Sequence, residues 1–138
     1  MKNLNIALIK RSMMLSALTA ITALTAKADI ITCSFTEPFI QTVYSMSKGT
    51  LTYKNGPANS VSVLKNISFQ IKDAGVFELI DKNKKVIQTL KLNFAGSDGM
   101  SDVVYPYDVK DNSEYLSSSP GVGGCVSNFL KSKEPKLK

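Results

Sequence analysis

The chain has 138 residues, with 17 Lys and Arg against 11 Asp and Glu, 43% apolar residues, two Cys, and no His or Trp. This length fits one ordinary domain. The absence of His removes the most common general base and the usual zinc ligand, so Ser-His-Asp, Cys-His and most zinc-dependent chemistry is excluded at the outset.

Residues 1–28 have the pattern of a secretory signal peptide. A start with two Lys and one Arg is followed by an uncharged run of small and apolar residues at 12–26. The segment ends in Ala26-Lys27-Ala28, with small residues at the −3 and −1 positions of signal peptidase, so we expect cleavage before Asp29. A transmembrane helix is the alternative, but it needs ~20 apolar residues. The sequence therefore predicts a periplasmic or secreted protein with no stable membrane insertion.

The basic character of the chain belongs to its two ends. Residues 1–28 hold four basic residues and no acidic ones, which leaves 13 Lys and 11 acidic residues after cleavage. Of these, residues 29–130 hold nine Lys and ten acidic residues. No Arg remains to supply the bidentate contact that reads guanine and phosphate. We expect no nucleic-acid partner, a single β domain at 29–130, and a flexible Lys-rich tail at 131–138.

Alternation of apolar and polar residues with a period of two, typical of half-buried strands, begins directly after the cleavage site. Residues 31–36 show it first, and residues 39–46 repeat it. Ser47-Lys48-Gly49 then predicts a turn into a third strand at 50–53. Asn55-Gly56-Pro57 ends this strand, because Asn and Gly tolerate positive φ and Pro cannot donate to a ladder. The three runs predict a first meander.

The central part of the chain predicts one more run and a hairpin. Residues 61–72 form the run, which a turn at Asp73-Ala74-Gly75 ends. Residues 76–80 and 86–94 then alternate on both sides of a charged turn, which is the clearest hairpin pattern in the sequence.

The last third of the chain is less regular. Pro106 makes residues 103–107 an edge strand or a bulge, because Pro has no N–H for a central ladder. The composition shifts to Ser, Gly, Asp and Asn at 110–124, which predicts a long surface loop. A final strand is expected at 125–130, beside the first strand. Seven or eight strands without a long amphipathic helix predict an all-β fold, a small antiparallel barrel or closed sandwich, because closure hides strand edges.

The two cysteines, Cys33 and Cys125, lie near opposite ends of the exported chain. In an oxidising compartment they are expected to form a disulfide. Closing so long a loop stabilises a fold by ~4 to 5 kcal/mol in the chain-entropy model. The alternative is a pair of buried free thiols. A redox role is not indicated, since the chain has no CxxC motif.

Two motifs resemble a family of uncharacterised exported bacterial proteins with small β domains, found beside META-type and lysozyme-inhibitor-type envelope domains. Thr36-Glu37-Pro38-Phe39 is similar to the E-P-F-W start of that family's first long strand. The segment 98–107, DGMSDVVYPY, is similar to its D-G-M-S-D-x-x-Y-P-Y motif, with Gly124-Cys125 following.

The chain departs from the family pattern in two places. Ile40 stands where the family has an aromatic residue, and Gly96-Ser97 stands where a Cys is expected before D-G-M-S-D. On the resemblance, Cys125 therefore takes another partner, Cys33. The resemblance implies a fold and a compartment but no activity.

The segment 98–107 is the densest group of polar side chains in the sequence, and carboxylate, hydroxyl and aromatic groups there fit a ligand or a hard cation. Its candidate ligand-binding residues are Asp98, Met100, Ser101, Asp102, Tyr105 and Tyr107. The competing interpretation, which we favour, is structural. In that interpretation Asp98 and Ser101 cap backbone N–H groups, Gly99 takes a positive φ, and Met100 fills the end of the barrel. The spacing matches no EF-hand, and no metal or other cofactor is expected.

Catalytic groups are sparse. Glu37 is a candidate carboxylate, with Asp98 or Asp102 as its partner, but no separation between them is defined, so a glycosidase-type pair is not indicated. The Ser-rich stretch 113–119 has no G-x-S-x-G elbow and is expected to be a loop. The sequence favours a non-catalytic binding domain that uses loops at one end on an envelope or extracellular ligand. A protein inhibitor of lysozyme or another wall hydrolase is the alternative.

Overall fold

The computed structural model describes residues 29–36, 39–116 and 120–130, and the described residues form nine β-strands joined by turns and loops. The predicted signal peptide at 1–28 and the predicted tail at 131–138 lie outside them. The strands are β1 (Ile30–Thr36), β2 (Phe39–Ser45), β3 (Thr50–Asn55), β4 (Ser60–Lys65), β5 (Ser68–Asp73), β6 (Val76–Ile80), β7 (Val86–Gly96), β8 (Tyr105–Asp111) and β9 (Gly121–Ser127). The predicted all-β class is confirmed.

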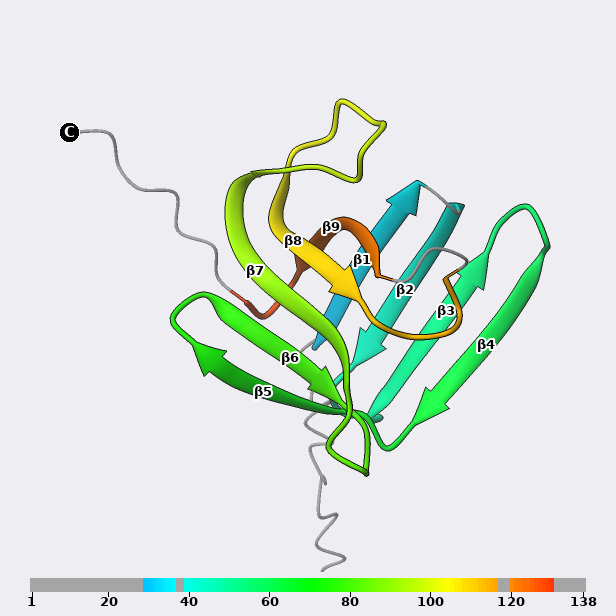
Figure 1. Ribbon diagram of the computed structural model, residues 1–138, viewed down its shortest axis with the longest axis vertical. Helices are drawn as coiled ribbons and strands as arrows, with labels where there is room; N and C mark the ends of the chain where they lie inside the picture. The colour runs from blue at the N-terminus through cyan, green and yellow to red at the C-terminus, as the bar shows by residue number, and fades with distance from the viewer. Residues whose placement is uncertain (1–28, 37–38, 117–119, 131–138) are drawn as a thin grey trace, which may run out of the picture.

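All nine strands belong to one sheet, in the order β4-β3-β2-β1-β9-β8-β7-β6-β5 (Figure 1). Every neighbouring pair is antiparallel. β1 to β3 form the predicted meander, and β6 and β7 form the predicted hairpin. β9 pairs with β1, as expected of the last strand.

The sheet is open between β4 and β5, so the predicted closed barrel or closed sandwich is wrong. These strands follow each other in the chain but lie at opposite ends of the sheet. Because eight antiparallel pairings separate them, they run in the same direction. Closing the sheet would make a parallel pair, which needs a crossover of about a dozen residues, and only Asn66 and Ile67 join β4 to β5.

The bend at Asn66 also explains the strand count. Residues 61–72 were expected to form one run, but Asn66 has a φ of 59°, which interrupts an extended backbone. The next residue, Ile67, is 3% exposed, and its N–H donates to the carbonyl of Gly49 at 2.9 Å. This bond ties the bend to the β2–β3 turn and directs β5 away from β4, which gives nine strands instead of seven or eight.

The curved sheet encloses one apolar core on its concave side. Leu51 of β3 and Leu90 of β7 belong to the same buried cluster, although they lie in opposite halves of the sheet order. In Figure 1, β5 to β7 form one side of the fold and β1 to β4 form the other. Contact between the two halves therefore comes from the inward residues of each strand, as the period-two pattern predicted.

Glycine places β9 in the middle of the sheet. A Cβ on Gly123 would lie 2.2 Å from the carbonyl oxygen of Ser34 in β1, and a Cβ on Gly124 would lie 2.4 Å from the Tyr105 ring. These contacts leave room only for hydrogen. The predicted loop at 110–124 is therefore wrong at both ends, because β8 continues to Asp111 and β9 begins at Gly121.

Pro106 lies in β8, which is a central strand between β7 and β9. The prediction of an edge strand is wrong, and the alternative of a bulge is confirmed. The β7–β8 register shifts between Leu92 and Gly96, whose partners Tyr107 and Tyr105 flank the proline. The irregular ladder removes the need for the N–H that Pro lacks.

The predicted disulfide is confirmed. Cys33 of β1 and Cys125 of β9 are direct partners in the ladder, and their sulfurs are bonded at 2.02 Å. Both residues are buried, at 1% and 0% exposure. The bond joins strands that are 92 residues apart in the chain, so it links the two halves of the sheet at its centre.

Replacing Cys33 or Cys125 by Ser is expected to lower the free energy of unfolding by about 2 to 5 kcal/mol, because each change frees a long loop and leaves a hydroxyl in the core. Urea unfolding of the wild type and of each variant, with and without reductant, measures the loss of unfolding free energy. Val126→Ala, next to Cys125 but 44% exposed, is the matched control and should change little. Equal stability of the oxidised and reduced wild-type protein would contradict the prediction.

Candidate functional site

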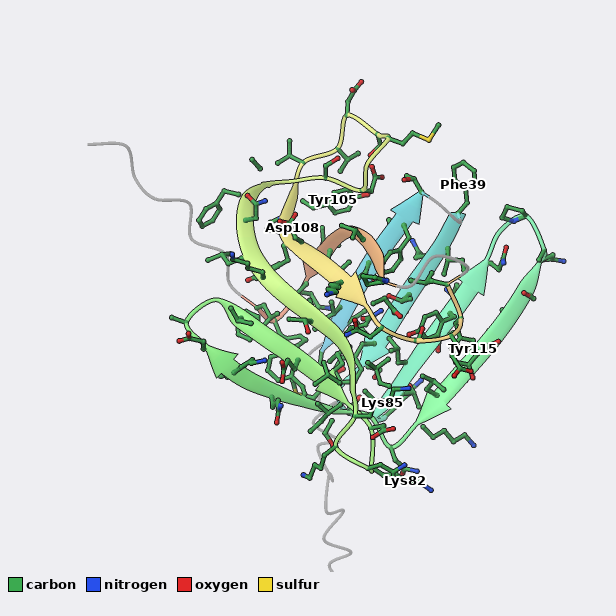
Figure 2. All side chains as sticks on the ribbon, in the orientation of Figure 1. Phe39, Lys82, Lys85, Tyr105, Asp108 and Tyr115 are labelled. Carbon is green, nitrogen blue, oxygen red and sulfur yellow. A yellow bond between two sulfur atoms is a disulfide. The ribbon has the colours of Figure 1, made fainter. Side chains whose placement is uncertain are left out.

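The loop of residues 97–104, between β7 and β8, is organised around the carboxylate of Asp98. This carboxylate is 7% exposed and accepts hydrogen bonds from four donors. They are the N–H groups of Met100 and Ser101, at 3.0 and 2.8 Å, the Ser101 hydroxyl at 2.7 Å, and the Tyr105 hydroxyl at 3.2 Å. Figure 2 labels Tyr105 directly below the loop.

These donors also determine the charge of Asp98. They hold its pKa at about 2, below the ordinary 3.8, and the N–H of Met100 contributes most, followed by Ser101. Four bonds occupy the acceptor sites that two carboxylate oxygens offer. The arrangement supports the structural interpretation of Asp98, because no acceptor site is left over for a ligand or cation.

A second contact fixes the loop to β1. The Thr36 hydroxyl donates to the carbonyl of Asp98 at 2.8 Å. Gly99 follows with a φ of 98°, and a Cβ there would lie 3.1 Å from the same hydroxyl oxygen. The backbone angle favours glycine, as the structural interpretation predicted, and a Cβ would also crowd the Thr36 hydroxyl.

The six candidate residues divide into an inner and an outer group. Asp98, Tyr105 and Tyr107 are buried. Tyr107 packs edge-on against Phe77, with ring centroids 5.9 Å apart, and burial raises the pKa of its hydroxyl. The tyrosine rings therefore belong to the core and offer no stacking face to a ligand.

The outer group consists of Met100, Ser101 and Asp102, which are exposed. Met100 is 71% exposed, so the expectation that it fills the end of the fold is wrong. The local reason is the bonding of Asp98, which uses the backbone N–H of Met100 and leaves its side chain free to point outward. Glu37, the other candidate carboxylate, lies outside the described residues.

A hollow of about 630 Å³ lies beside this loop. It is lined by residues of β1, the loop and the start of β9, namely Thr36, Ser97, Asp98, Gly99, Met100, Pro120 and Val122. A second hollow, of about 620 Å³, shares Ser97 and Val122 with the first. The second continues over the outer face of β7 and β8, where Lys91 and Lys110 line it. The two hollows therefore adjoin.

Exposed apolar side chains lie in the first hollow and on the segments next to it, and we call them the apolar rim. Met100 and Val122 line the hollow itself, Val103 and Val104 follow in the same loop, and Phe39 pairs with Thr36 at the adjacent ends of β1 and β2. Phe39 is labelled at this end in Figure 2. The rim residues are 54–71% exposed: Phe39, Met100, Val103, Val104 and Val122.

A buried polar cluster on the concave side was not predicted. Asp111 is fully buried, and one of its oxygens accepts hydrogen bonds from the Tyr53 hydroxyl and the Gln88 amide, both at 2.7 Å. Its other oxygen accepts from the N–H of Ser113 at 2.7 Å. The Gln88 amide also donates to the Thr42 hydroxyl at 3.1 Å. The cluster joins β2, β3, β7 and β8.

Two properties characterise this cluster. Burial and the charge of Asp111 raise the pKa of Tyr53, so its hydroxyl remains a donor. The Gln88 amide oxygen is buried without a protein partner. Part of the cluster could have been found in the sequence, because Thr42 and Gln88 are polar residues at apolar positions of their alternating runs. The sequence predicted a surface loop at Asp111, so nothing in the pattern indicated that this residue is buried.

Comparison with protein-family models, with curated proteins and with solved structures gives no match for this chain. Within the described part of the chain, no helix is long and apolar enough to span a membrane. No group of three or more Cys, Asp or Glu residues is placed to hold a metal ion among these same residues.

Replacing Tyr53 by Phe is expected to lower the free energy of unfolding by about 1 to 3 kcal/mol, because it leaves a buried carboxylate oxygen with one donor fewer. Tyr44→Phe is the matched control, since the Tyr44 hydroxyl makes only a long bond of 3.5 Å, to the carbonyl of Ile67. Urea unfolding of both variants measures the difference. Equal losses would show that the Asp111 contact adds no stability.

Replacing Asp98 by Asn is expected to destabilise the protein at neutral pH. A carboxylate whose pKa is lowered on folding stabilises the native state above its unfolded pKa, near 3.8, and loses this effect as the pH falls toward 2. The difference in unfolding free energy between D98N and the wild type should therefore shrink between about pH 4 and pH 2. Unfolding curves at a series of pH values measure it.

Asp102→Asn is the control for this experiment, because Asp102 is an exposed carboxylate in the same loop. It should leave stability unchanged at every pH. A D98N difference that stays constant across the acid range would contradict the role assigned to the Asp98 carboxylate.

Proposed function

We propose that the protein is an exported, non-catalytic β domain that binds an envelope or extracellular ligand through the loop end of its sheet. The observation that supports this proposal is the apolar rim. Five exposed apolar side chains lie in the hollow at one end of the fold or on the segments next to it, and apolar surface gathered in this way is typical of interaction sites.

The way the loop is held supports a binding role. Asp98 fixes the loop from inside and Thr36 fixes it to β1, so the exposed Met100 is carried on an ordered backbone. A surface that is already ordered loses little conformational entropy when a ligand binds. Exported binding domains commonly place such contacts on loops above a rigid sheet.

The composition of the chain and the bonding of Asp98 agree with a non-catalytic role. The chain has no His, and the Asp98 carboxylate already accepts four hydrogen bonds. The inhibitor alternative calls for a loop that carries Ser, Lys or Tyr into the acidic cleft of a lysozyme, and residues 97–104 offer Ser97 and Ser101 but no Lys or Tyr. The resemblance to exported bacterial β domains remains a hypothesis that agrees with the proposed compartment.

The experiment measures binding of the oxidised protein to three probes, namely purified peptidoglycan sacculi, soluble wall fragments and vesicles of envelope phospholipid. The double variant Met100→Ser, Val104→Ser should weaken binding to the recognised probe by about tenfold or more, equivalent to about 1.4 kcal/mol. Val126→Ser is the matched control, since Val126 is an exposed valine on β9 outside the rim. It should bind as the wild type does.

Binding to none of the three probes, or equal binding by the double variant, would contradict the proposal. Lysozyme activity in the presence of excess protein tests the alternative, and inhibition would favour it over the binding role. Thermal unfolding of each variant confirms that the fold is retained, because Met100 contributes only its backbone N–H to the bonding of Asp98.

A further inference from the structure

The two ends of the open sheet differ in how they would receive another strand. β4 and β5 are the terminal strands, and no other segment pairs with their outer edges in the part of the chain that the structure describes. In Figure 1 these edges diverge from each other. An edge strand presents unpaired N–H and C=O groups, which pair readily with a strand of another chain unless something prevents it.

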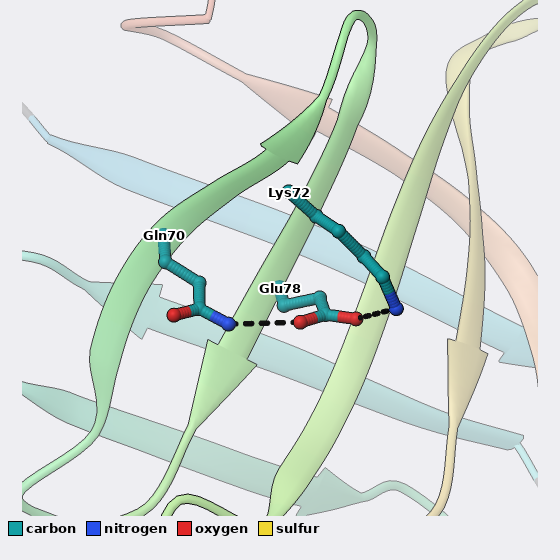
Figure 3. Close-up of polar contacts among 3 residues, drawn as sticks. All are labelled: Gln70, Lys72 and Glu78. Atoms are coloured by element: carbon teal, nitrogen blue, oxygen red, sulfur yellow. Dashed lines mark hydrogen bonds and ion pairs between the residues drawn. The ribbon is translucent and has the colours of Figure 1, made fainter.

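The β5 edge carries a feature that opposes such pairing. Its register with β6 shifts between Ile71 and Asp73, so the strand is irregular at Lys72. Lys72 does not add a free charge to this edge, because its side chain reaches across the neighbouring strand β6, where its ammonium contacts the Glu78 carboxylate at 2.7 Å while Gln70 donates to the other oxygen at 2.8 Å (Figure 3). Irregular backbone is a typical protection of an edge strand.

The β4 edge has no such irregularity. Its six residues pair with β3 without any shift of register. The sequence Ser-Val-Ser-Val-Leu-Lys contains no Pro and no acidic residue, and its one charge is at the end of the strand. Val61 and Val63 point outward from the sheet and are 65% and 50% exposed. A regular edge with exposed valines and a single charge at its end is suited to strand pairing.

We propose that β4 pairs with β4 of a second copy of this chain, antiparallel about a twofold axis. Pairing Ser62 with Ser62 of the second copy places Val61 opposite Val63 of that copy. By the same symmetry, Val63 lies opposite Val61 of that copy. The four valines then lie together on the outer face, because residues opposite each other share a face of the sheet. In this register Lys65 lies opposite Asn59, so no like charges face each other.

The protected β5 edge explains why this assembly stops at two copies. If β4 of one copy could pair with β5 of the next, the sheet would grow without end, since a head-to-tail contact does not close. The irregular backbone of β5 opposes that pairing. Only the pairing of β4 with β4 of a second copy remains. This contact covers the β4 edge of each copy, so no unprotected edge is left and the dimer is closed.

The test is the mass of the protein in solution, measured by sedimentation across a wide range of concentration. The protein is expressed from its full sequence and purified with the Cys33–Cys125 bond oxidised. The wild type should reach twice the mass of one chain. Val63→Lys should raise the dissociation constant of this dimer by about tenfold or more, because the change places two charges at the contact. Val126→Lys, an equal change on the central strand β9, should leave the dimer intact.

The register has a separate test in single cysteine substitutions. Ser62→Cys should give a disulfide-linked dimer under mild oxidation, because the two new sulfurs face each other across the twofold axis. Ser60→Cys is the control and should not, since the two residues 60 are four positions apart along the paired strands, or about 13 Å. Peptide mass spectrometry identifies the linked pair and checks that Cys33 and Cys125 remain bonded to each other.

Three results would overturn the proposal. They are a monomer at every concentration, a dimer that V63K leaves unchanged, and open-ended assemblies in place of dimers. If V63K does not fold, as shown by its melting curve, the cross-linking pair decides, because Ser62 and Ser60 are small polar positions at which Cys adds little volume. Equal cross-linking of S62C and S60C would then reject the β4 pairing.

Discussion

The pairing of β1 with β9 is the contact on which the rest of the fold depends. Residues of the two strands lie about 90 positions apart in the chain, and their ladder joins β1–β4 to β5–β8 in one sheet. Two features of the sequence make this contact specific. Gly123 and Gly124 allow the backbone of β9 to approach Ser34 and Tyr105, and the Cys33–Cys125 disulfide holds the ladder in one register.

The same pairing assembles the loop end. Thr36 is the last residue of β1 and Val122 lies near the start of β9, so the β1–β9 ladder brings both beside the loop of residues 97–104. Thr36 can then donate to the carbonyl of Asp98. The hollow and its apolar rim therefore depend on a contact made deep in the sheet, which links the stability of the fold to the surface proposed for binding.

The features that the sequence could predict were those determined locally. Alternation identified the first meander and the β6–β7 hairpin because buried and exposed positions follow each other along one strand. The strand β9 was wrongly predicted as part of a loop. Glycine is needed at positions 123 and 124 because atoms of β1 and β8 leave no room for a Cβ, and residues next to them in the sequence do not reveal this. Within the candidate site, local capping by Asp98 was predictable, whereas the outward direction of Met100 and the burial of Asp111 depended on tertiary contacts.

The open sheet raises the question of what aligns its two halves across the core. Between β4 and β5 no ladder sets their relative position, and apolar contacts are non-directional, so several alignments would bury similar area. The polar cluster is directional, because Asp111 must receive Tyr53 from one half and Gln88 from the other. An alignment that separated them would leave a buried carboxylate with too few donors, which costs more than the net worth of the bonds themselves. The cluster therefore adds directional contacts across the core, between β2 and β3 on one side and β7 and β8 on the other, and favours one arrangement of the curved sheet.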